Sequence, residues 1–393
     1  MNKNTPQPLK KKRQTPQKAD VPAGPNSIQP KNRLLSLDVM RGLIMILLAG
    51  ESCLLYVSFR DLQPNGTTAY LFNHLLQHHP WNGLRLWDLI QPAFMLMAGS
   101  ALYISYQNKA AKGITWETNF KHVAIRCAKL FLLGLVIQSV DKGNLAWELW
   151  NVLTQLSVTT IIAYAIIRKS GAFQLIFSII LLILTEVLYR FVLVPGYDQP
   201  FVIGKNFGSY MDMVLMGKIN PNGWVAINVI PTAAHTIWGV LAGKLLIGKT
   251  STSHKMKTLL LAGLCGLVIG YSLDIASVTP IIKRISTSSF VFASGGWVLL
   301  FLGLLYWMTD IKKINRYAWL FAMVGMNSIF IYLFLDTIGY QWFNGFVSIF
   351  VKGFTGFVGM PENIQAFLSA MFTLFAECYL CYWLYRKKIF FKL

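Results

Sequence analysis

Apolar stretches of about 20 residues, separated by short polar connections, recur along most of this 393-residue chain. A helix needs roughly 20 apolar residues to cross about 30 Å of hydrocarbon. Hydrophobic residues make up 54% of the chain and charged residues only 13%, against roughly 25% charged in a typical soluble domain. Such stretches could not all face water in a soluble protein. The sequence therefore predicts a protein that crosses the bilayer many times.

We expect an all-α, polytopic transmembrane helical bundle of about ten spans. The predicted spans lie near Asp38–Ser58, Leu84–Tyr106, Val123–Val140, Val152–Ile167, Phe173–Leu193, Trp224–Ile247, Thr258–Leu273, Ser288–Met308, Trp319–Thr337 and Asn363–Tyr385. The stretch Trp342–Phe357 is short and interrupted by glycine, so we expect an interfacial or re-entrant segment there. No internal repeat is visible, whereas inverted repeats would have favoured a transporter.

Basic residues indicate how this bundle is oriented. Clusters of Lys and Arg follow the second, fourth, sixth, eighth and tenth predicted spans, at Lys109–Lys121, Arg168–Lys169, Lys249–Lys257, Lys312–Arg316 and Arg386–Lys392. Cytoplasmic loops carry an excess of Lys and Arg, so ten spans place both termini in the cytoplasm. The net charge of +20 follows from the same rule. No motif typical of nucleic-acid binding occurs, so we expect no nucleic-acid partner.

The first 33 residues differ in composition from the rest of the chain. They are polar, rich in proline and basic, with a cluster at Lys10–Arg13. No apolar region with a small-residue cleavage site follows, so a cleaved signal peptide is not predicted. We expect residues 1–33 to be a disordered cytoplasmic tail, in contact with anionic lipid, and residues 34–393 to form the transmembrane domain. The expected location is the bacterial inner (cytoplasmic) membrane.

The five cysteines give no sign of a disulfide framework or a metal site. Cys378 and Cys381 form a C-x-x-C within an apolar stretch, and no second pair exists elsewhere in the chain. A metal site of this kind needs further ligands at a fixed spacing. We therefore expect packing residues on a membrane helix, and no metal.

Ionisable residues at membrane depth are candidates for function. Asp38 and Arg41 are three residues apart at the mouth of the first span, so they share a helix face. They form either a structural ion pair at the cytoplasmic interface or a site for a charged ligand from the cytoplasm. Other ionisable groups in apolar stretches are expected to snorkel or to bond neighbouring helices: Glu51, Glu186, His235, Asp336 and Glu377.

A second polar cluster begins at His78 and His79 and is followed by Asp88. Histidine can take up and return a proton near neutral pH. A histidine in an aromatic loop, close to a membrane-embedded carboxylate, is a candidate base. The carboxylate would hold the imidazole tautomer, as in hydrolase triads. His74 and His79 have the same chemistry as His78, so residue types alone do not choose among them.

Several short motifs occur in a characteristic order. They are S-x-D-x-x-R-G at Ser36–Gly42, H-x-x-W-x-G at His78–Gly83, D-L-x-x-P within Arg85–Pro92, L-A-G-K at Leu241–Lys244, G-M-N-S at Gly325–Ser328 and Y-R-K-K-I-F at Tyr385–Phe390. From about Arg33 to the C-terminus, this order and spacing resemble the heparan-α-glucosaminide N-acetyltransferase family, including its bacterial relatives.

The resemblance implies an acetyl-CoA-dependent N-acetyltransferase. Acetyl-CoA would be held by the bundle from the cytoplasmic side, and the acetyl group would pass to the amine of a terminal glucosamine-type sugar on the periplasmic side. The family's active histidine matches His78, not His79, and its supporting carboxylate matches Asp88. The predicted donor contacts are Asp38, Arg41, Lys244 and Asn327. Of these, Arg41 and Lys244, together with Lys129, are candidates for the CoA phosphates from topology.

Three positions depart from the family pattern. Ser52 stands where the family commonly has Asn, Gln155 replaces an Arg, and Gln91 replaces an aromatic residue before Pro92. These departures concern substrate contacts more than the fold. Two other activities stay open: a membrane O-acyltransferase acting on envelope glycans, and a sugar transporter. The expected partners are an amino-sugar or glycan acceptor, acetyl-CoA and the lipid bilayer, and a homodimer is compatible with the sequence.

Overall fold

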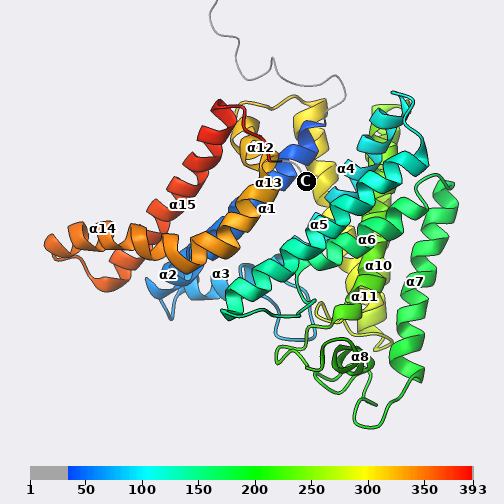
Figure 1. The fold of residues 1–393 in the computed structure, drawn as a ribbon, viewed down its shortest axis with the longest axis horizontal. Helices are drawn as coiled ribbons and strands as arrows, with labels where there is room; N and C mark the ends of the chain where they lie inside the picture. Colours follow the sequence, from blue (N-terminus) through cyan, green and yellow to red (C-terminus); the bar gives the residue numbers. More distant parts are fainter. Residues whose placement is uncertain (1–33, 392–393) are drawn as a thin grey trace, which may run out of the picture. The chain divides into compact units, whose positions relative to one another are not determined.

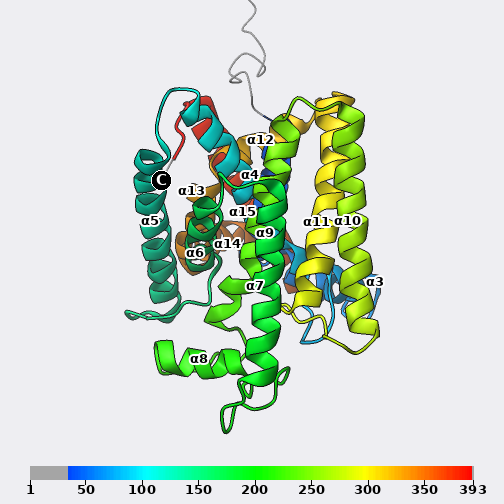
Figure 2. The same ribbon diagram turned by 90° about the vertical axis from the view of Figure 1, so that its right-hand side faces the viewer.

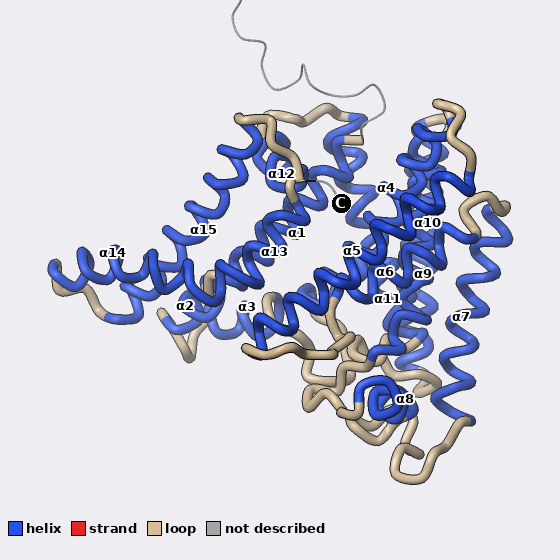
Figure 3. Tube along the Cα trace, viewed as in Figure 1, coloured by secondary structure: helices blue, strands red, loops and turns tan. Residues whose placement is uncertain are grey.

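The computed structural model describes residues 34–391, and the predicted tail of residues 1–33 lies outside them. Within this range the chain forms helices joined by loops, as Figures 1 and 3 show. Its only β-structure there is two isolated bridges, Asn82 with Ile282 and Val194 with Tyr197. The predicted all-α class is confirmed.

The α-helices follow one another with short connections. They are α1 (Leu35–Ser52), α2 (Leu55–Asp61), α3 (Thr67–Leu75), α4 (Ile90–Ala110), α5 (Trp116–Lys142), α6 (Val152–Ala165), α7 (Gly171–Phe191), α8 (Phe207–Met216), α9 (Val229–Ile247), α10 (Thr252–Ile275), α11 (Ser288–Tyr306), α12 (Ala318–Met326), α13 (Ser328–Phe334), α14 (Asn344–Phe357) and α15 (Glu362–Arg386). The 3₁₀ turns η2 (Leu86–Leu89) and η3 (Ala226–Asn228) and the π-helical sections η4 (Trp307–Ile311) and η5 (Leu335–Phe343) extend some of them.

Among the described residues, 7 helices are long and apolar enough to cross a membrane, or 9 if each bent pair is one span. The bent pairs are α1 with α2, and α12 with the helix from Ser328 to Phe357. The shorter apolar helix α6 is a further candidate. Each of the ten predicted spans falls on one of these elements. The chain is therefore a multi-pass membrane protein.

Glycines allow the closest helix packing in the bundle. Helix α4 lies along α9, and α10 lies along α11, as Figure 2 shows. A Cβ added at Gly99 of α4 would lie 1.9 Å from the Thr236 carbonyl oxygen, and one at Gly239 of α9 would lie 2.0 Å from that of Leu96. Only residues without a side chain permit this approach, as at other membrane helix crossings.

The S-x-D-x-x-R-G motif and the G-M-N-S motif meet at a similar helix crossing, between α1 and α12. A Cβ at Gly42 would lie 1.8 Å from the Phe321 carbonyl oxygen, and one at Gly325 would lie 2.5 Å from that of Asp38. Two motifs nearly 300 residues apart in the sequence therefore share one helix contact. Their glycines are required by packing, independently of any ligand.

The first predicted span is broken, which the sequence did not indicate. Leu54 adopts a left-handed conformation with φ 62°, and α2 leaves α1 at an angle of 58°. Gly50 leaves room for the Tyr56 ring to fold back over the end of α1, where the Tyr56 hydroxyl donates to the Leu47 carbonyl oxygen at 2.8 Å. This hydrogen bond holds the start of α2 against the end of α1.

The ninth predicted span also bends, by 73° at Asn327. Beyond it, residues Ser328–Phe357 form one helix, with η5 as a π-helical section between α13 and α14. Helix α14 then lies against α15, as seen in Figure 1. The stretch Trp342–Phe357 is therefore the continuation of the ninth span, and its predicted interfacial position stays a prediction.

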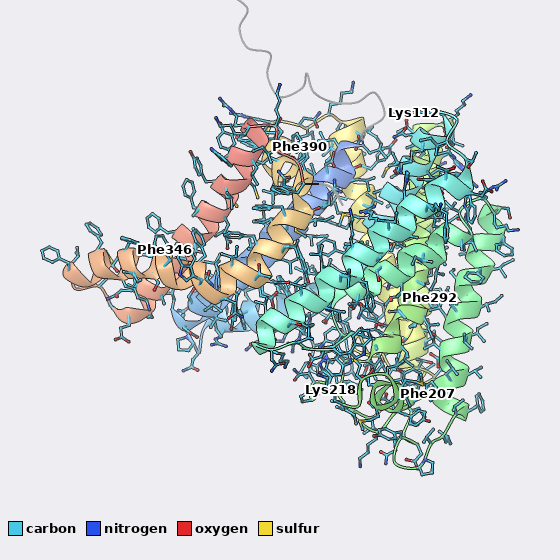
Figure 4. All side chains as sticks on the ribbon, in the orientation of Figure 1. Lys112, Phe207, Lys218, Phe292, Phe346 and Phe390 are labelled. Carbon is cyan, nitrogen blue, oxygen red and sulfur yellow. The ribbon has the colours of Figure 1, made fainter. Side chains whose placement is uncertain are left out.

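The two ends of the bundle differ in chemistry. One end carries basic residues such as Lys112 and is uppermost in Figure 4; we call it the basic end, formed by the connections 111–115, 248–251 and 312–317 and by residues 386–391. The opposite end carries Phe207 and Lys218 (Figure 4); we call it the loop end, formed by residues 76–85, 192–206, 217–225 and 276–287.

Candidate active site

The site lies at the loop end and is built on the segment from His78 to Arg85. Trp81 anchors this segment, because its indole nitrogen donates to the Phe201 carbonyl oxygen at 2.8 Å. The Trp81 ring packs on Gly223, where φ is +80° and a Cβ would lie 2.7 Å from the ring. The Gly83 amide donates to the Ile281 carbonyl oxygen at 2.7 Å. The tryptophan and glycine of the H-x-x-W-x-G motif thus hold this loop against the other loops of the loop end.

Asp88 holds the same segment through hydrogen bonds from a buried position. It is fully buried and sits at the start of the span that η2 and α4 form. Its Oδ2 accepts backbone N–H groups from His79 at 3.2 Å and from Arg85 at 2.9 Å. Its Oδ1 lies 2.9 Å from Nδ1 of His78. One carboxylate therefore fixes both the backbone of the loop and one edge of the imidazole.

Lys283 completes this cluster from the loop between α10 and α11. Its Nζ lies 3.0 Å from Nδ1 of His78 and 3.5 Å from Oδ1 of Asp88. The Lys283 side chain is 7% exposed, and Nζ lies 5.5 Å from the centre of the Trp224 ring. Docking of the His78 segment onto residues 281–283 brings the lysine to the histidine. Both hydrogen-bonding groups on Nδ1 are therefore ionisable.

The other ring nitrogen of His78 is available for chemistry. The His78 side chain is 36% exposed, and within residues 34–391 its Nε2 makes no hydrogen bond. Burial and the nearby Lys283 charge lower the pKa of His78, although Asp88 opposes this. An imidazole whose pKa lies below its usual value of about 6.5 is mostly neutral near pH 7, as a general base requires.

His78 faces a cavity of about 960 Å³ at the loop end, which we call the outer cavity. Its wall includes Arg85, Trp224 and Arg284 from the loops, and the carboxylates of Glu51 and Asp336 from α1 and η5. The break between α1 and α2 borders it at Ser52 and Leu54. A volume of this size accommodates one or two sugar rings.

Two smaller cavities continue from the outer cavity into the bundle. The middle cavity, about 230 Å³, shares His78, Glu51 and Trp224 with the outer cavity. The inner cavity, about 110 Å³, has Arg41 and Arg126 in its wall. Residues common to the middle and inner cavities are Phe94, Val152 and Tyr332. The three cavities thus form a series that leads from Arg41 to His78.

Two of the three departures from the family pattern meet in the middle cavity. The Gln91 amide nitrogen donates to Oε1 of Gln155, and both side chains line this cavity with His78. Both are almost completely buried. Gln91 and Gln155 are therefore bonded to one another, which the sequence alone did not reveal.

At the basic end, Asp38 and Arg41 form an ion pair with 2.6 Å between Oδ1 and the guanidinium. The predicted pair is therefore present, and Arg41 also reaches the inner cavity. Asp310 accepts the backbone N–H groups of Leu35 at 3.2 Å and Ser36 at 3.0 Å. It thereby caps the first turn of α1, where helix N–H groups lack partners.

Asn327 and Lys244 lie apart from His78. The Asn327 amide nitrogen donates to the Ile389 carbonyl oxygen at 3.1 Å, and its oxygen accepts the Phe391 N–H at 3.1 Å. Asn327 thus holds the Y-R-K-K-I-F segment against the bend between α12 and α13. Lys244 borders a separate apolar groove of about 680 Å³ between α7, α9, α10 and α11. The structure does not bring these two predicted donor contacts to the cavity series.

Sequence reasoning missed Lys283, Trp224 and Tyr332 as site residues. Lys283 lies 205 residues from His78 in the sequence, in the loop between α10 and α11. The one signal for it was a lysine and an arginine side by side in a loop otherwise poor in charge. Within the described residues, no group of three or more His, Cys, Asp or Glu side chains could hold a metal ion.

Comparison with known proteins gives the family of this chain. Residues 33–270 match the family model described as heparan-alpha-glucosaminide N-acetyltransferase, catalytic, which covers more than half of the chain. The chain belongs to this family. The His78–Asp88 pair, the two arginines of the inner cavity and the Gln91–Gln155 pair all lie within the matched range, and Lys283 lies beyond it.

Two curated relatives carry the same description as the heparan-alpha-glucosaminide N-acetyltransferase family. The human heparan-alpha-glucosaminide N-acetyltransferase is 25% identical over an alignment of 431 residues, which covers 92% of this chain and 60% of the human protein. The mouse heparan-alpha-glucosaminide N-acetyltransferase is 24% identical over 432 residues, covering 92% of this chain and 61% of the mouse protein. The chain therefore spans about 60% of the length of these relatives.

Proposed function

We propose that this protein is an acetyl-CoA-dependent N-acetyltransferase that passes acetyl groups across the membrane. The donor is acetyl-CoA on the cytoplasmic side, and the acceptor is the amine of a terminal glucosamine-type sugar on the other side. The family supports the reaction class. The observation that carries the transmembrane route is the series of three adjoining cavities between Arg41 and His78.

The donor would enter at the basic end. CoA is too large and too highly charged to cross lipid, so its phosphates stay near the cytoplasm while its thioester reaches inward. Arg41 and Arg126 line the inner cavity and offer guanidinium groups, which pair well with phosphate. The Gln91–Gln155 pair lines the next cavity and provides amide groups along the path of the pantetheine arm.

The acceptor would enter from the loop end. A glucosamine amine is largely protonated near neutral pH and must lose a proton before it attacks a thioester. Glu51 and Asp336 line the outer cavity and suit an acceptor that arrives as an ammonium ion. The same wall carries Arg85 and Arg284, so the choice of an amine over a hydroxyl acceptor rests on the family.

His78 is the proposed catalytic residue, with Asp88 as its support. Nε2 of His78 takes the proton from the amine as the nitrogen attacks the thioester carbonyl. Asp88 holds the ring at Nδ1 and stabilises the positive charge that develops beside it, as a buried carboxylate does in hydrolase triads. Direct transfer and an acetyl-histidine intermediate both use this arrangement.

The proposed orientation follows from charge. The basic end carries the excess of Lys and Arg that marks cytoplasmic loops, so the loop end with His78 faces outward. We accordingly expect the inner membrane of a bacterium, with the acceptor site on the periplasmic side. A homodimer remains compatible with this arrangement.

The deciding experiment uses purified protein in sealed liposomes, with acetyl-CoA on one side and glucosamine on the other. We expect N-acetylglucosamine to form on the acceptor side when acetyl-CoA faces the basic end. His78→Ala should abolish transfer, and His79→Ala should retain most of it, because the His79 contact to Asp88 comes from its backbone.

Each competing activity predicts a different product. Glucosamine uptake that does not depend on acetyl-CoA would identify a transporter, and an ester in the product by mass spectrometry would identify an O-acyltransferase. Equal activity of the His78→Ala and His79→Ala proteins would remove His78 from the reaction. Transfer that occurs only with both substrates on one side would contradict the transmembrane route.

A further inference from the structure

Two groups compete for one edge of the candidate base. Nδ1 of His78 lies 2.9 Å from Oδ1 of Asp88 and 3.0 Å from Nζ of Lys283. Nδ1 is either a donor or an acceptor, depending on the tautomer. The carboxylate needs a proton on Nδ1, whereas a charged ammonium needs the lone pair of Nδ1. The protonation of Lys283 therefore decides the tautomer of His78.

The two tautomers differ in their ability to act as a base. When Lys283 is charged, it donates to Nδ1, and the single proton of the neutral imidazole is on Nε2. Nε2 then has no lone pair to offer the outer cavity. When Lys283 is neutral, Nδ1 keeps its proton between Asp88 and Nζ, and the lone pair of Nε2 faces the cavity. Only the second state can accept a proton from the acceptor amine.

We propose that Lys283 is the proton partner of His78, and that its neutral form receives the Nδ1 proton while Nε2 takes up the proton of the acceptor amine. This inference rests on the proposed acetyl transfer. The ammonium form of the acceptor first loses one proton to water. As the C–N bond then forms and the C–S bond breaks, a second proton leaves the nitrogen for Nε2, and one moves from Nδ1 to Lys283. Both shifts reverse when the departing CoA thiolate takes the proton from Nε2, so the products are an amide and a thiol.

The surroundings of Lys283 fit this role. Asp88 and His78 contact its amine directly, Glu51 of α1 attracts its charge, and Arg284 beside it repels the charge. Burial is the largest effect and lowers the pKa of Lys283 to about 8, although Asp88 and Glu51 oppose it. A fraction of the side chain is therefore neutral near pH 7, unlike an ordinary lysine with a pKa near 10.4.

Two substitutions separate proton transfer from charge. Lys283→Met removes the amine, and Lys283→Arg keeps a positive charge that stays protonated at any usable pH. We expect both to lower kcat by roughly 100-fold, the lower range for a group that assists proton transfer, with donor binding retained. An arginine variant with nearly full activity would show that the charge alone matters, and a fully active methionine variant would show that the amine is dispensable.

A matched control and a folding test accompany these variants. Lys218 is also at the loop end and pairs with Glu148 at 2.9 Å, away from the cavity series. Lys218→Met and Lys218→Arg should therefore retain wild-type kcat. Thermal unfolding with and without CoA checks that each variant is folded and binds the donor. The arginine variant keeps a cation beside Asp88, so it decides the question if the methionine variant is unstable.

The pH profile of the wild-type enzyme tests the same point without substitution. Because Lys283 must be neutral, kcat/KM should rise with pH through about 8. The acceptor amine also titrates, so the assay compares two amino-sugar acceptors of different amine pKa. The apparent pKa that reports the acceptor amine should differ between the two acceptors. The apparent pKa that reports Lys283 should be the same with both acceptors and should be missing from the profile of Lys283→Met.

The outcomes distinguish the two proposals. A wild-type profile in which every rise moves with the acceptor would overturn the proton-partner role while leaving the acetyltransferase intact. Absence of acetyl-CoA-dependent acetylation of any amine by the wild-type protein would instead overturn the proposed function itself.

Discussion

The loop end and the basic end of the bundle use equally prominent motif residues in different ways. At the loop end, His78 bonds to Asp88 and Lys283 through one ring nitrogen and turns the other toward a cavity of about 960 Å³. At the basic end, Asn327 bonds to backbone, and Gly42 and Gly325 serve a helix crossing. A polar motif residue is thus a candidate for catalysis where one of its hydrogen-bonding atoms has no partner and faces a cavity. It has a structural role where all of its hydrogen-bonding atoms are bonded within the protein.

The largest effect that tests this comparison is expected at Asp88. Asp88→Asn keeps the shape of the side chain but turns an amide toward Nδ1 or the loop backbone and removes the negative charge. The wrong His78 tautomer is then favoured, so we expect kcat to fall by roughly 10³-fold in the acetylation assay.

The matched control for Asp88→Asn is Asp61→Asn. Asp61 is exposed and pairs with Arg60 at 2.8 Å, outside the cavity series, so kcat should be unchanged. An Asp88→Asn protein that keeps wild-type kcat would show that the carboxylate only folds the loop, and the contrast between the two ends would fail.

A smaller effect is expected where the basic end reaches the cavities. Arg41→Met removes a guanidinium from the wall of the inner cavity, while Arg126 remains. We expect the Kd for CoA to rise about 10-fold, the loss of one charge-assisted contact of roughly 1.4 kcal/mol, with kcat little changed.

Isothermal titration with CoA measures the Arg41→Met effect, and Lys244→Met is its comparison. Lys244 lines the apolar groove between α7, α9, α10 and α11, so its loss should leave the Kd unchanged. The reverse result, with Lys244 affecting the Kd and Arg41 not, would move the donor out of the cavity series.

The sequence predicted the helices well because bilayer thickness sets their length. Each of the ten expected spans falls on a helix or a bent pair. The bends were not predictable, because they depend on single residues. Leu54 adopts φ 62° without being glycine or asparagine, the usual residues in that conformation, and the π-helical section at Leu335–Phe343 has no sequence signature.

The sequence identified only those residues of the candidate site that lie close together along the chain. His78 and Asp88 are ten residues apart and belong to two adjoining motifs. Lys283 joins them through the docking of two loops, and Gln155 joins Gln91 through the packing of α4 and α6. Contacts of this kind arise from tertiary structure, and no spacing in the sequence predicts them.

The smallest expected effect concerns Asn327, which the family resemblance assigned to the donor. Its amide already bonds to the Ile389 carbonyl oxygen and the Phe391 N–H. Hydrogen bonds within membrane proteins contribute about 0.6 kcal/mol each, so Asn327→Ala should lower the free energy of unfolding by about 1 kcal/mol and leave the Kd for CoA unchanged.

Thermal unfolding and CoA titration on the same Asn327→Ala preparation measure both quantities. If the Kd for CoA rose as much as in Arg41→Met while the stability was unchanged, Asn327 would be a donor contact after all. Because the backbone groups at residues 389 and 391 would lose their partner in the variant, we expect the stability change alone. Asn327 would then be a residue that closes the C-terminal segment over the bend, so that the basic end keeps its shape around the donor.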